Sequence, residues 1–393
     1  MIKCSVKDLD VNGKTILVRV DFNVPVRDGE VTDDTRIRRA LPTIQYLLEG
    51  GARLALISHL GRPKGEPDPK FAMDPVAERL EELLGAQVEK LDTAVGPEVE
   101  EALNESNGEG VVLLENSRFY PGETKNDPEF SEQLAAPFDL YVDDAFGAVH
   151  RKHASVYDVA TRLPSAAGPL VATEVGVLQR LTQDPARPYA VVLGGSKVSD
   201  KLKVIEALLP KVDTLLVGGG MCFTFLAAQG HDVGSSLLEA DQVDACRAFL
   251  ETGKVVLPVD VLAADRFAAD ADVQVVAADA IPSARMGLDI GPRSVAAFTD
   301  ALAGARTVFW NGPMGVFELA PYAEGTRGVA EAVAELSSGA GTALTVVGGG
   351  DSAAAVRALG IDEARFTHIS TGGGASLEYL EGKALPGLTI LED

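Results

Sequence analysis

Short apolar runs alternate with amphipathic stretches along the whole chain. Runs of four to six apolar residues are typical of buried strands, whereas apolar residues spaced three or four apart predict helices. Regular alternation of the two predicts parallel sheets with helical crossovers. The expected strands are 15–20, 54–58, 111–115, 140–143, 189–193, 214–217, 255–257, 307–310, 345–347 and 368–370, and the expected helices are 36–50, 74–84, 127–136, 198–208, 221–229, 240–251, 325–337 and 374–381.

The alternation is interrupted once, near the middle of the chain. The segment 163–169, Leu-Pro-Ser-Ala-Ala-Gly-Pro, predicts a break, and the apolar spacing after it predicts a connecting helix over 170–183. A chain of 393 residues is also long enough for two domains. We therefore expect an α/β protein with two Rossmann-like domains, 1–169 and 170–384, each a parallel sheet flanked by helices, joined by a hinge helix.

The amino-acid composition argues against several classes of binding partner and protein. The net charge of −23 argues against nucleic acid, which is bound mainly by Lys and Arg side chains. The three cysteines, Cys4, Cys222 and Cys246, form no C-x-x-C pair and predict neither a disulfide framework nor a zinc ribbon. There is no apolar leader and no run of ~18 apolar residues that could span a bilayer. We expect a soluble, cytoplasmic protein with no membrane partner.

Glycine-rich turns follow the strands of the second half. Backbone N–H groups in such turns, and the helix N-termini behind them, are suited to phosphate. The turns are equally compatible with plain tight βα connections, and none matches G-x-x-x-x-G-K-[ST] or G-x-G-x-x-G. The turns are Gly194-Gly195-Ser196-Lys197, Gly218-Gly219-Gly220, Gly348-Gly349-Gly350-Asp351-Ser352 and Gly372-Gly373-Gly374.

Four side chains near these turns favour a Mg-nucleotide ligand. Lys197 and Lys201 are four residues apart, so on the expected helix both ammonium groups would lie on one face and reach phosphate together. Asp351 could either cap the helix that it begins or hold Mg²⁺. Glu318 follows the Trp310 strand, where a carboxylate could accept hydrogen bonds from ribose hydroxyls.

In the first half the strand ends carry charge instead. Arginine binds phosphate and carboxylate through paired N–H groups, although a surface ion pair is its commoner role. Asp21 and Asn23 could accept hydrogen bonds from substrate hydroxyls, and Asp21 could equally be the partner of an arginine. His150 and His153 lack a third residue at metal-ligand spacing. The expected cations at one edge of the sheet are Arg36, His59, Arg62, Arg118 and Arg151.

Six motifs, in this order, resemble those of the phosphoglycerate kinase family, and the likeness extends over nearly the whole chain. One departure from the family pattern is Asp143, which stands where the family usually has Asn and adds a negative charge near an anion site; Lys152 and Cys222 are also atypical, at positions without an assigned role. The motifs are Arg19-Val20-Asp21-Phe22-Asn23-Val24-Pro25, His59-Leu60-Gly61-Arg62-Pro63, Glu115-Asn116-Ser117-Arg118-Phe119-Tyr120-Pro121-Gly122-Glu123, Asp144-Ala145-Phe146-Gly147, Gly194-Gly195-Ser196-Lys197-Val198-Ser199-Asp200-Lys201 and Trp310-Asn311-Gly312-Pro313.

The resemblance implies reversible phosphoryl transfer from 1,3-bisphosphoglycerate to ADP, giving 3-phosphoglycerate and ATP, in glycolysis and gluconeogenesis. It implies a monomer with hinge-type closure, in which the domain 1–169 binds 3-phosphoglycerate, the domain 170–384 binds Mg-nucleotide and the tail 385–393 packs back on the first domain. In the ATP-consuming direction the nucleophile is a carboxylate, ionised at neutral pH, so no general base is expected.

The resemblance also assigns roles to individual residues. The implied 3-phosphoglycerate ligands are Asp21, Asn23, Arg36, His59, Leu60, Gly61, Arg62, Arg118 and Arg151. The implied ligands of ATP or ADP are Lys197, Lys201, Gly220, Gly287, Asn311, Glu318, Gly349, Gly350, Asp351 and Ser352, with Asp351 on Mg²⁺. The implied catalytic groups are Arg36, Lys197, Lys201, Gly372 and Gly373.

Two other classes of function fit the sequence less well. A dinucleotide-dependent dehydrogenase would need a G-x-G-x-x-G fingerprint followed by an acidic residue, and this pattern is absent. A nucleotide-regulated binding module could keep the fold and lose transfer, but the presence of Arg36, Lys197, Lys201 and Asp351 argues against it.

Overall fold

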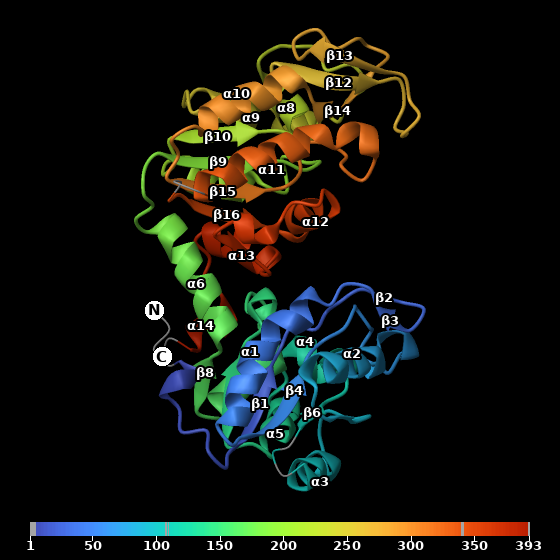
Figure 1. Ribbon diagram of the computed structural model, residues 1–393, viewed down its shortest axis with the longest axis vertical. Coiled ribbons are helices and arrows are strands. Elements are labelled where there is room, and N and C mark those ends of the chain that lie inside the picture. Colours follow the sequence, from blue (N-terminus) through green and yellow to red (C-terminus); the bar gives the residue numbers. More distant parts are fainter. Residues whose placement is uncertain (1–4, 107, 109, 339–341, 392–393) are drawn as a thin grey trace. The chain divides into compact units, whose positions relative to one another are not determined.

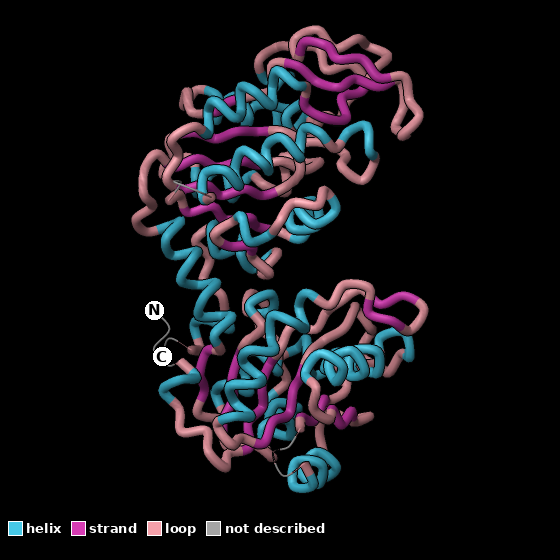
Figure 2. The backbone as a smooth tube through the Cα atoms, in the orientation of Figure 1, coloured by secondary structure: helices cyan, strands magenta, loops and turns pink. Residues whose placement is uncertain are grey.

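The computed structural model describes residues 5–391 apart from 107, 109 and 339–341. The chain divides into two compact units, Met1–Gly176 with Ala384–Asp393, and Val177–Lys383. The division lies inside α6 (Pro169–Thr182), as Figure 1 labels it. Each unit contains its own six-stranded parallel sheet between helices, drawn in magenta and cyan in Figure 2. The expected α/β fold with two parallel sheets is confirmed.

The sheet of the first unit has the order β5-β6-β4-β1-β7-β8, and its strands are parallel. A short hairpin, β2 with β3, lies outside this sheet. The elements are β1 (Thr15–Arg19), β2 (Val26–Arg27), β3 (Glu30–Val31), α1 (Thr35–Glu49), β4 (Arg53–Ile57), α2 (Asp74–Leu84), β5 (Val88–Lys90), α3 (Pro97–Glu105), β6 (Val111–Leu113), α4 (Pro121–Lys125), α5 (Pro128–Ala135), β7 (Leu140–Asp143), β8 (Ser165–Ala167) and α14 (Pro386–Thr389).

Both faces of this sheet are buried, which is typical of parallel sheets and explains the unbroken apolar runs. Successive side chains of β1 point to opposite faces. Ile16 and Val18 pack with Ile37 and Leu80, from α1 and α2. Leu17 packs on the other face, in a core that also includes residues of α3 and α5. The carboxyl edge of the sheet is therefore left for polar chemistry.

The expected break at 163–169 is wrong. Ser165–Ala167 is the edge strand β8, paired in parallel with β7, and Pro169 is the first residue of α6. Three small residues give no apolar signal, yet they fit against the neighbouring strand. Proline is tolerated at the first position of a helix because the N–H it lacks has no partner there.

The sheet of the second unit has the order β11-β10-β9-β15-β16-β17 and is also parallel. An antiparallel sheet, β13-β12-β14, was not predicted. The elements are β9 (Tyr189–Leu193), α7 (Leu202–Leu208), β10 (Thr214–Val217), α8 (Cys222–Ala228), α9 (Val243–Leu250), β11 (Val255–Val256), β12 (Asp260–Ala264), β13 (Val273–Ala277), β14 (Met286–Ile290), α10 (Pro292–Leu302), β15 (Thr307–Asn311), α11 (Glu324–Ser337), β16 (Leu344–Gly348), α12 (Gly350–Ala358), β17 (His368–Ile369) and α13 (Gly374–Leu380).

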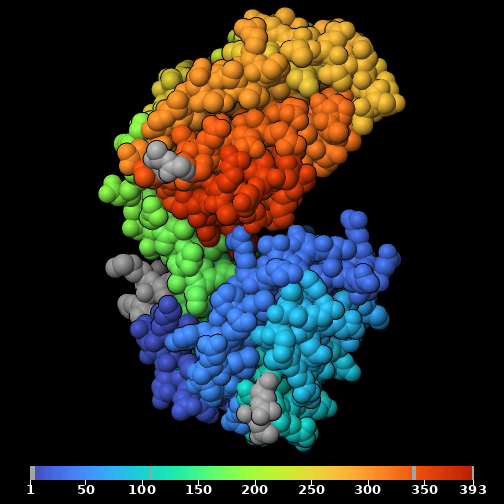
Figure 3. Space-filling view, in the orientation of Figure 1, coloured from blue at the N-terminus to red at the C-terminus, as the bar shows by residue number. Residues whose placement is uncertain are grey.

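One face of this second sheet forms a core with α10, α11 and α12. Trp310 and Val347, from β15 and β16, are fully buried together with Phe298 of α10 and Val333 of α11. Figure 3 shows the outer side chains of α10 and α11, in orange, at the surface of the unit. This face of the sheet is thus covered, and the loops at the carboxyl edge follow strands packed in the core.

The final helix packs on the first unit. In α14 the Gly387 N–H donates to the Val149 carbonyl at 2.8 Å, and Leu388 is buried. A Cβ on Gly387 would lie 2.9 Å from Val149 Cα, so the two backbones pack directly on each other. Residues 392 and 393 of the expected tail lie outside the described residues.

The length of the helices decides whether any of them could span a membrane. The longest described helix, α1, has 15 residues and is amphipathic. Over the described ranges no helix has both the length and the apolar character that crossing a membrane requires.

We predict that Gly168→Ala destabilises the first unit. A methyl group there would lie 2.1 Å from Asp144 Oδ1, the atom that accepts the Leu170 N–H at the start of α6. Such overpacking typically costs about 1–3 kcal/mol, so the melting temperature should fall by several degrees. Gly176→Ala is the control, because nothing lies within 4 Å of that position and alanine favours a helix. Equal melting temperatures for the two variants would contradict the packing described.

Candidate functional site

The carboxyl ends of β6, β4, β1 and β7 lie side by side, because these strands are neighbours in the first sheet. The residues that follow them form what we call the cation site. Arg36 joins the group from the first turn of α1. The others are Asp21 and Asn23 after β1, His59, Leu60, Gly61 and Arg62 after β4, Arg118 after β6 and Arg151 after β7.

The polar residues after β1 fix Arg36. Its Nη1 lies 3.0 Å from Asp21 Oδ2 and donates to the Asn23 carbonyl at 3.2 Å. The Asn23 side chain accepts the Gly61 N–H at 2.9 Å, which ties this loop to the loop after β4. Asp21 is therefore the ion-pair partner of an arginine, which is one of the two roles expected for it. About a third of the Arg36 side chain stays exposed, so the group remains accessible.

Arg118 is buried among other cations. Its Nη1 donates to the Gly61 carbonyl at 2.7 Å, while its buried Nε has no hydrogen-bond partner among the described residues. Burial, followed by the charges of Arg151 and Arg19, lowers the pKa of Arg118 to about 10. It stays protonated at neutral pH, with a donor left over for an anion.

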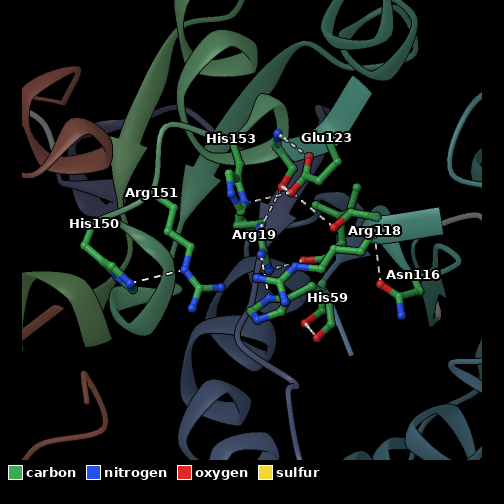
Figure 4. Close-up of polar contacts among 12 residues, drawn as sticks. Arg19, His59, Asn116, Arg118, Glu123, His150, Arg151 and His153 are labelled. Atoms are coloured by element: carbon green, nitrogen blue, oxygen red, sulfur yellow. Dashed lines mark hydrogen bonds and ion pairs between the residues drawn. The ribbon is translucent and has the colours of Figure 1, made fainter. Parts of the chain in front are cut away.

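His59 is neutral in this setting. Burial, followed by the positive charges around it and Arg19 first among them, lowers its pKa well below the ordinary range. Arg19 Nη2 lies 2.9 Å from His59 Nδ1 (Figure 4). Arg62, by contrast, is exposed, and Arg151 donates through Nε to His150 Nε2 at 3.2 Å.

Sequence reasoning missed the residues that hold the cation site in place. Asn116 accepts the N–H groups of Leu60 and Arg118 through Oδ1, at 3.2 and 3.0 Å, and so clamps two loops. Glu123 is fully buried and accepts from Ser155. Both lie in the motif 115–123, but no pattern in the sequence indicates which buried partner a polar residue will have.

The two histidines considered for metal binding have other surroundings. His153 Nδ1 lies 3.8 Å from Glu123 Oε1, and burial is the largest cause of a pKa lowered to about 4. His150 accepts from Arg151. In the part of the chain that the structure describes, no three His, Cys, Asp or Glu side chains gather as a metal site.

Asp143 is buried at the end of β7, directly across from Arg19 of β1. Its Oδ1 accepts the Ala145 N–H at 2.9 Å. Burial is the largest cause of its raised pKa, about 7, with neighbouring Asp144 adding to it. The extra carboxyl group therefore carries only part of a negative charge at neutral pH, which limits its repulsion of a bound anion.

The second site is a pocket of about 260 Å³ in the second unit. It lies at the carboxyl ends of β9, β15, β16 and β17, four neighbours in the sheet. We call it the glycine pocket. It is lined by Gly194, Gly195, Ser196, Lys197, Asp200, Lys201, Asn311, Gly312, Gly349, Gly350, Asp351, Ser352, Gly373, Gly374 and Leu377.

Backbone turns meet so closely around the glycine pocket that side chains are excluded. A Cβ on Gly312 would lie 2.3 Å from the Gly194 carbonyl oxygen, and Gly312 has φ of +96°. Ser352 Oγ accepts the Gly312 N–H at 2.7 Å and donates to the Gly348 carbonyl at 2.8 Å. Three turns are thereby locked together, and the glycines serve more than plain βα connections.

Lys201 is the buried cation of this pocket. Its ammonium group donates to Asn311 Oδ1, and burial lowers its pKa while Asp200 and Asp351 oppose the shift. The ammonium group thus lies among the residues that line the glycine pocket, where it can bind an anion.

The helix expected over 198–208 begins later than predicted. α7 starts at Leu202, with Lys201 as its N-cap residue, so Lys197 and Lys201 do not share a helix face. The Glu239 carboxylate accepts the Ser199 N–H at 3.0 Å and its hydroxyl, which keeps this segment in a turn. Lys197 and Lys201 still line the same pocket.

Asp351 lies in the first turn of α12, whose N-cap is Gly349. It is therefore not the N-cap residue, one of the two roles considered for it. A single carboxylate beside Lys197 and Lys201 in the glycine pocket fits Mg²⁺, which usually takes one or two carboxylates and fills its other positions with phosphate oxygens and water.

The remaining predicted nucleotide residues do not line the glycine pocket itself. Gly220 lies beside Leu237, whose Cδ1 would be 2.8 Å from a Cβ there. Gly287 lies in β14 against the ring of Phe223. Glu318 follows β15 in an irregular segment, and Gly372 precedes the Gly373 turn.

Comparison with known proteins gives one family. The family profile described as phosphoglycerate kinase matches residues 6–383. The chain is 62% identical over 395 residues to a phosphoglycerate kinase of Rubrobacter xylanophilus, covering 100% of this chain and 99% of the relative. It is 63% identical over 392 residues to that of Salinispora arenicola, covering 98% and 97%.

Solved structures agree. The phosphoglycerate kinase from Coxiella burnetii matches with a TM-score of 0.86 and 41% identity, over 98% of both chains. The enzyme from Pyrococcus horikoshii matches with a TM-score of 0.85 and 33% identity, over 99% of this chain and 98% of the other.

We predict that Asp143→Asn changes the stability of the protein more favourably at pH 8 than at pH 5. The carboxyl pKa is raised from about 4 in the unfolded chain to about 7 in the fold, so the native state binds more protons between these values and loses stability as pH rises. Asparagine cannot ionise, and its variant escapes this loss. The melting temperatures of both proteins across pH 4–9 measure the difference.

Asp139→Asn is a control of opposite sign. The Thr15 N–H lowers the pKa of the Asp139 carboxyl, so this group stabilises the fold above its unfolded pKa and loses that effect as pH falls. Parallel pH profiles for wild type and Asp143→Asn would show that Asp143 titrates normally.

Proposed function

Because the chain belongs to the phosphoglycerate kinase family, we propose that it transfers a phosphoryl group reversibly from 1,3-bisphosphoglycerate to ADP, giving 3-phosphoglycerate and ATP. Members of the family are glycolytic kinases, phosphotransferases with a carboxyl acceptor. The observation that carries the proposal is that each of the two units has its own, chemically different site. One unit collects cations at the carboxyl edge of its sheet, and the other collects glycine turns, Lys201 and Asp351.

The cation site is the proposed site of 3-phosphoglycerate. Its accessible Arg36 and the spare donor of Arg118 suit a phosphate and a carboxylate. The substrate carboxylate is itself the nucleophile in the ATP-consuming direction, so no side chain has to remove a proton. The proposed substrate residues are Asp21, Asn23, Arg36, His59, Leu60, Gly61, Arg62, Arg118 and Arg151.

The glycine pocket is the proposed site of the phosphates of ATP and ADP. Lys201 and Lys197 line it, and the N-termini of α12 and α13 begin there. Mg²⁺ held by Asp351 would neutralise phosphate charge when bound. The proposed nucleotide residues are Lys197, Lys201, Gly220, Gly287, Asn311, Glu318, Gly349, Gly350, Asp351 and Ser352, with Gly372 and Gly373 stabilising the group in transfer.

Transfer between two units requires that the bound ligands meet. Reacting atoms must approach to ~3–3.5 Å, whereas charged ligands must also enter and leave. We propose hinge-type closure in which α6 and its flanking turns absorb the rotation. Because the chain crosses from one unit to the other inside this helix, it is the natural element for the role.

We further propose that the protein acts as a cytoplasmic monomer in glycolysis and gluconeogenesis. The few cysteines fit a reducing compartment, and the two buried ones, Cys222 and Cys246, are free. The net charge of −23 disfavours nucleic-acid partners.

The direct test of the function is ATP formation from 1,3-bisphosphoglycerate and ADP, with and without Mg²⁺. We expect turnover only with both substrates and the metal ion. A folded protein that binds both ligands without turnover would instead be a nucleotide-regulated binding module.

We predict that Arg36→Ala abolishes most turnover. Arg36 is proposed to contact both the substrate and the transferring group, and an arginine in that role contributes roughly 10³–10⁵ in rate. The kcat at saturating substrates measures the loss. A decrease of less than about tenfold, or ~1.4 kcal/mol of barrier, would show that Arg36 has another role. Arg38→Ala is the matched control, because that side chain is more exposed and pairs with Asp34.

Asp351→Asn is expected to raise the Mg²⁺ concentration needed for half-maximal activity at least tenfold and to leave the melting temperature nearly unchanged. The substitution keeps the shape of the side chain and removes the charge proposed to hold the ion. Because Gly349 is the N-cap, no helix cap is lost. If the magnesium titration does not move, Asp351 does not hold the ion.

Closure predicts that the radius of gyration in solution shrinks most when both ligands are bound. Small-angle scattering of the free protein, of each single complex and of the complex with 3-phosphoglycerate and ATP analogue measures it. Equal radii for the free and doubly liganded protein would defeat the hinge proposal.

A further inference from the structure

Arg19, at the end of β1, is only 1% exposed although it carries a full charge. Its Nε donates to Ser155 Oγ at 3.0 Å, and its Nη1 donates to the Val20 carbonyl and, at 3.3 Å, to the Ile57 carbonyl. Its Nη2 lies 2.9 Å from His59 Nδ1. Most of its donors are therefore spent on the protein itself, and it lies beside His59 of the cation site (Figure 4).

The contact with His59 decides where the imidazole proton lies. A guanidinium group can only donate, so Nδ1 of His59 must accept and carries no proton. An imidazolium has no acceptor, and the ring must then be neutral with its single proton on Nε2. Hydrogen positions on histidine usually have to be assigned by choice, but here the partner leaves one possibility.

We propose that Arg19 is a positioning residue that fixes His59 as the neutral tautomer with its proton on Nε2, and that Ser155 and Glu123 hold Arg19 in place. The proposal that this tautomer serves 3-phosphoglycerate rests on the proposed function; the tautomer itself does not.

Ser155 and Glu123 hold Arg19 in place. Ser155 Oγ accepts from Arg19, so its own proton goes to Glu123 Oε1 at 2.7 Å, while the Ser155 N–H reaches Glu123 Oε2 at 2.9 Å. Ser117 Oγ adds a third bond to the same carboxylate at 3.2 Å. Glu123 and Ser155 are fully buried. The negative charge of the buried Glu123 thus offsets the positive charge of the buried Arg19 through the Ser155 hydroxyl. These hydrogen bonds form a series that ends at His59.

The surroundings reinforce the neutral ring. Positive charge and burial lower the pKa of the His59 imidazole, so protons do not compete with Arg19 for Nδ1 at neutral pH. The charged and titratable groups near this chain are Arg36 from α1, Arg118 and Glu123 after β6, and Asp143, Arg151 and His153 from and after β7.

The tautomer of His59 determines whether the ring attracts or repels an anionic substrate. An Nε2–H presents a hydrogen-bond donor to an oxyanion, whereas the other tautomer presents a lone pair and repels it. Loss of the tautomer should therefore raise KM for 3-phosphoglycerate about tenfold, as expected for one hydrogen bond. It should leave KM for ATP unchanged, because that ligand is assigned to the other unit.

Nitrogen-15 NMR of the histidine-labelled protein tests the tautomer directly. The chain has five histidines, and the His59 signals are assigned by their loss in His59→Gln. We expect a pyrrole-like Nε2 and a pyridine-like Nδ1 from pH 5 to pH 8. In Arg19→Met, which removes donor and charge at similar length, the ring should show mixed tautomers and begin to titrate within this range.

Two further variants keep the test decisive. Arg19→Lys retains a cationic donor and should recover part of the Nε2–H population. Ser155→Ala removes the acceptor for Arg19 Nε and should move the His59 signals even if Arg19→Met does not fold.

A wild-type ring protonated on Nδ1 would overturn the proposal, and so would tautomer signals unchanged in a folded Arg19→Met. If the tautomer is as expected but 1,3-bisphosphoglycerate and ADP give no ATP, the proposed function fails and the positioning of His59 stands.

Discussion

Parallel pairing is the constraint on which the rest of this structure depends. It buries both faces of each sheet and brings the loops after neighbouring strands to one edge. In the first unit that edge receives side chains such as Arg36 and Arg118, and in the second it receives backbone turns around Lys201. The two sites use the same topology with different chemistry, and both are suited to anions in a protein whose net charge is −23.

The two sites stabilise their closely spaced positive charges in different ways. Oxygen acceptors hold the arginines of the first site: the Gly61 carbonyl accepts from Arg118, and the Ser155 hydroxyl, itself bonded to Glu123, accepts from Arg19. Burial, and then repulsion by neighbouring cations, lowers the pKa of Arg118. Without these contacts that repulsion would act on a loosely held cluster. The glycine pocket instead contains one buried ammonium group, held beside turns that pack backbone against backbone. Both arrangements are preorganised, which is what electrostatic stabilisation of a phosphoryl group requires.

Much of the fold could be predicted because strands buried on both faces are unbroken apolar runs; 140–143, 189–193 and 214–217 have the predicted bounds. The edge strand Ser165–Ala167 and the antiparallel strand β13 could not, because small residues and half-exposed strands give little pattern. The motifs identified residues at both sites, but not their partners. The link from His59 through Arg19 to Glu123 joins positions 59, 19 and 123, and only the fold brings them together.

The central claim is that each unit holds its own anion, and separate calorimetric titrations test it most directly. 3-Phosphoglycerate and Mg-ADP are titrated into wild type, Arg118→Ala and Lys201→Ala. The account predicts that Arg118→Ala weakens only 3-phosphoglycerate and Lys201→Ala only the nucleotide, each by at least about tenfold, or ~1.4 kcal/mol. Equal losses of both ligands in either variant would contradict the division of the sites.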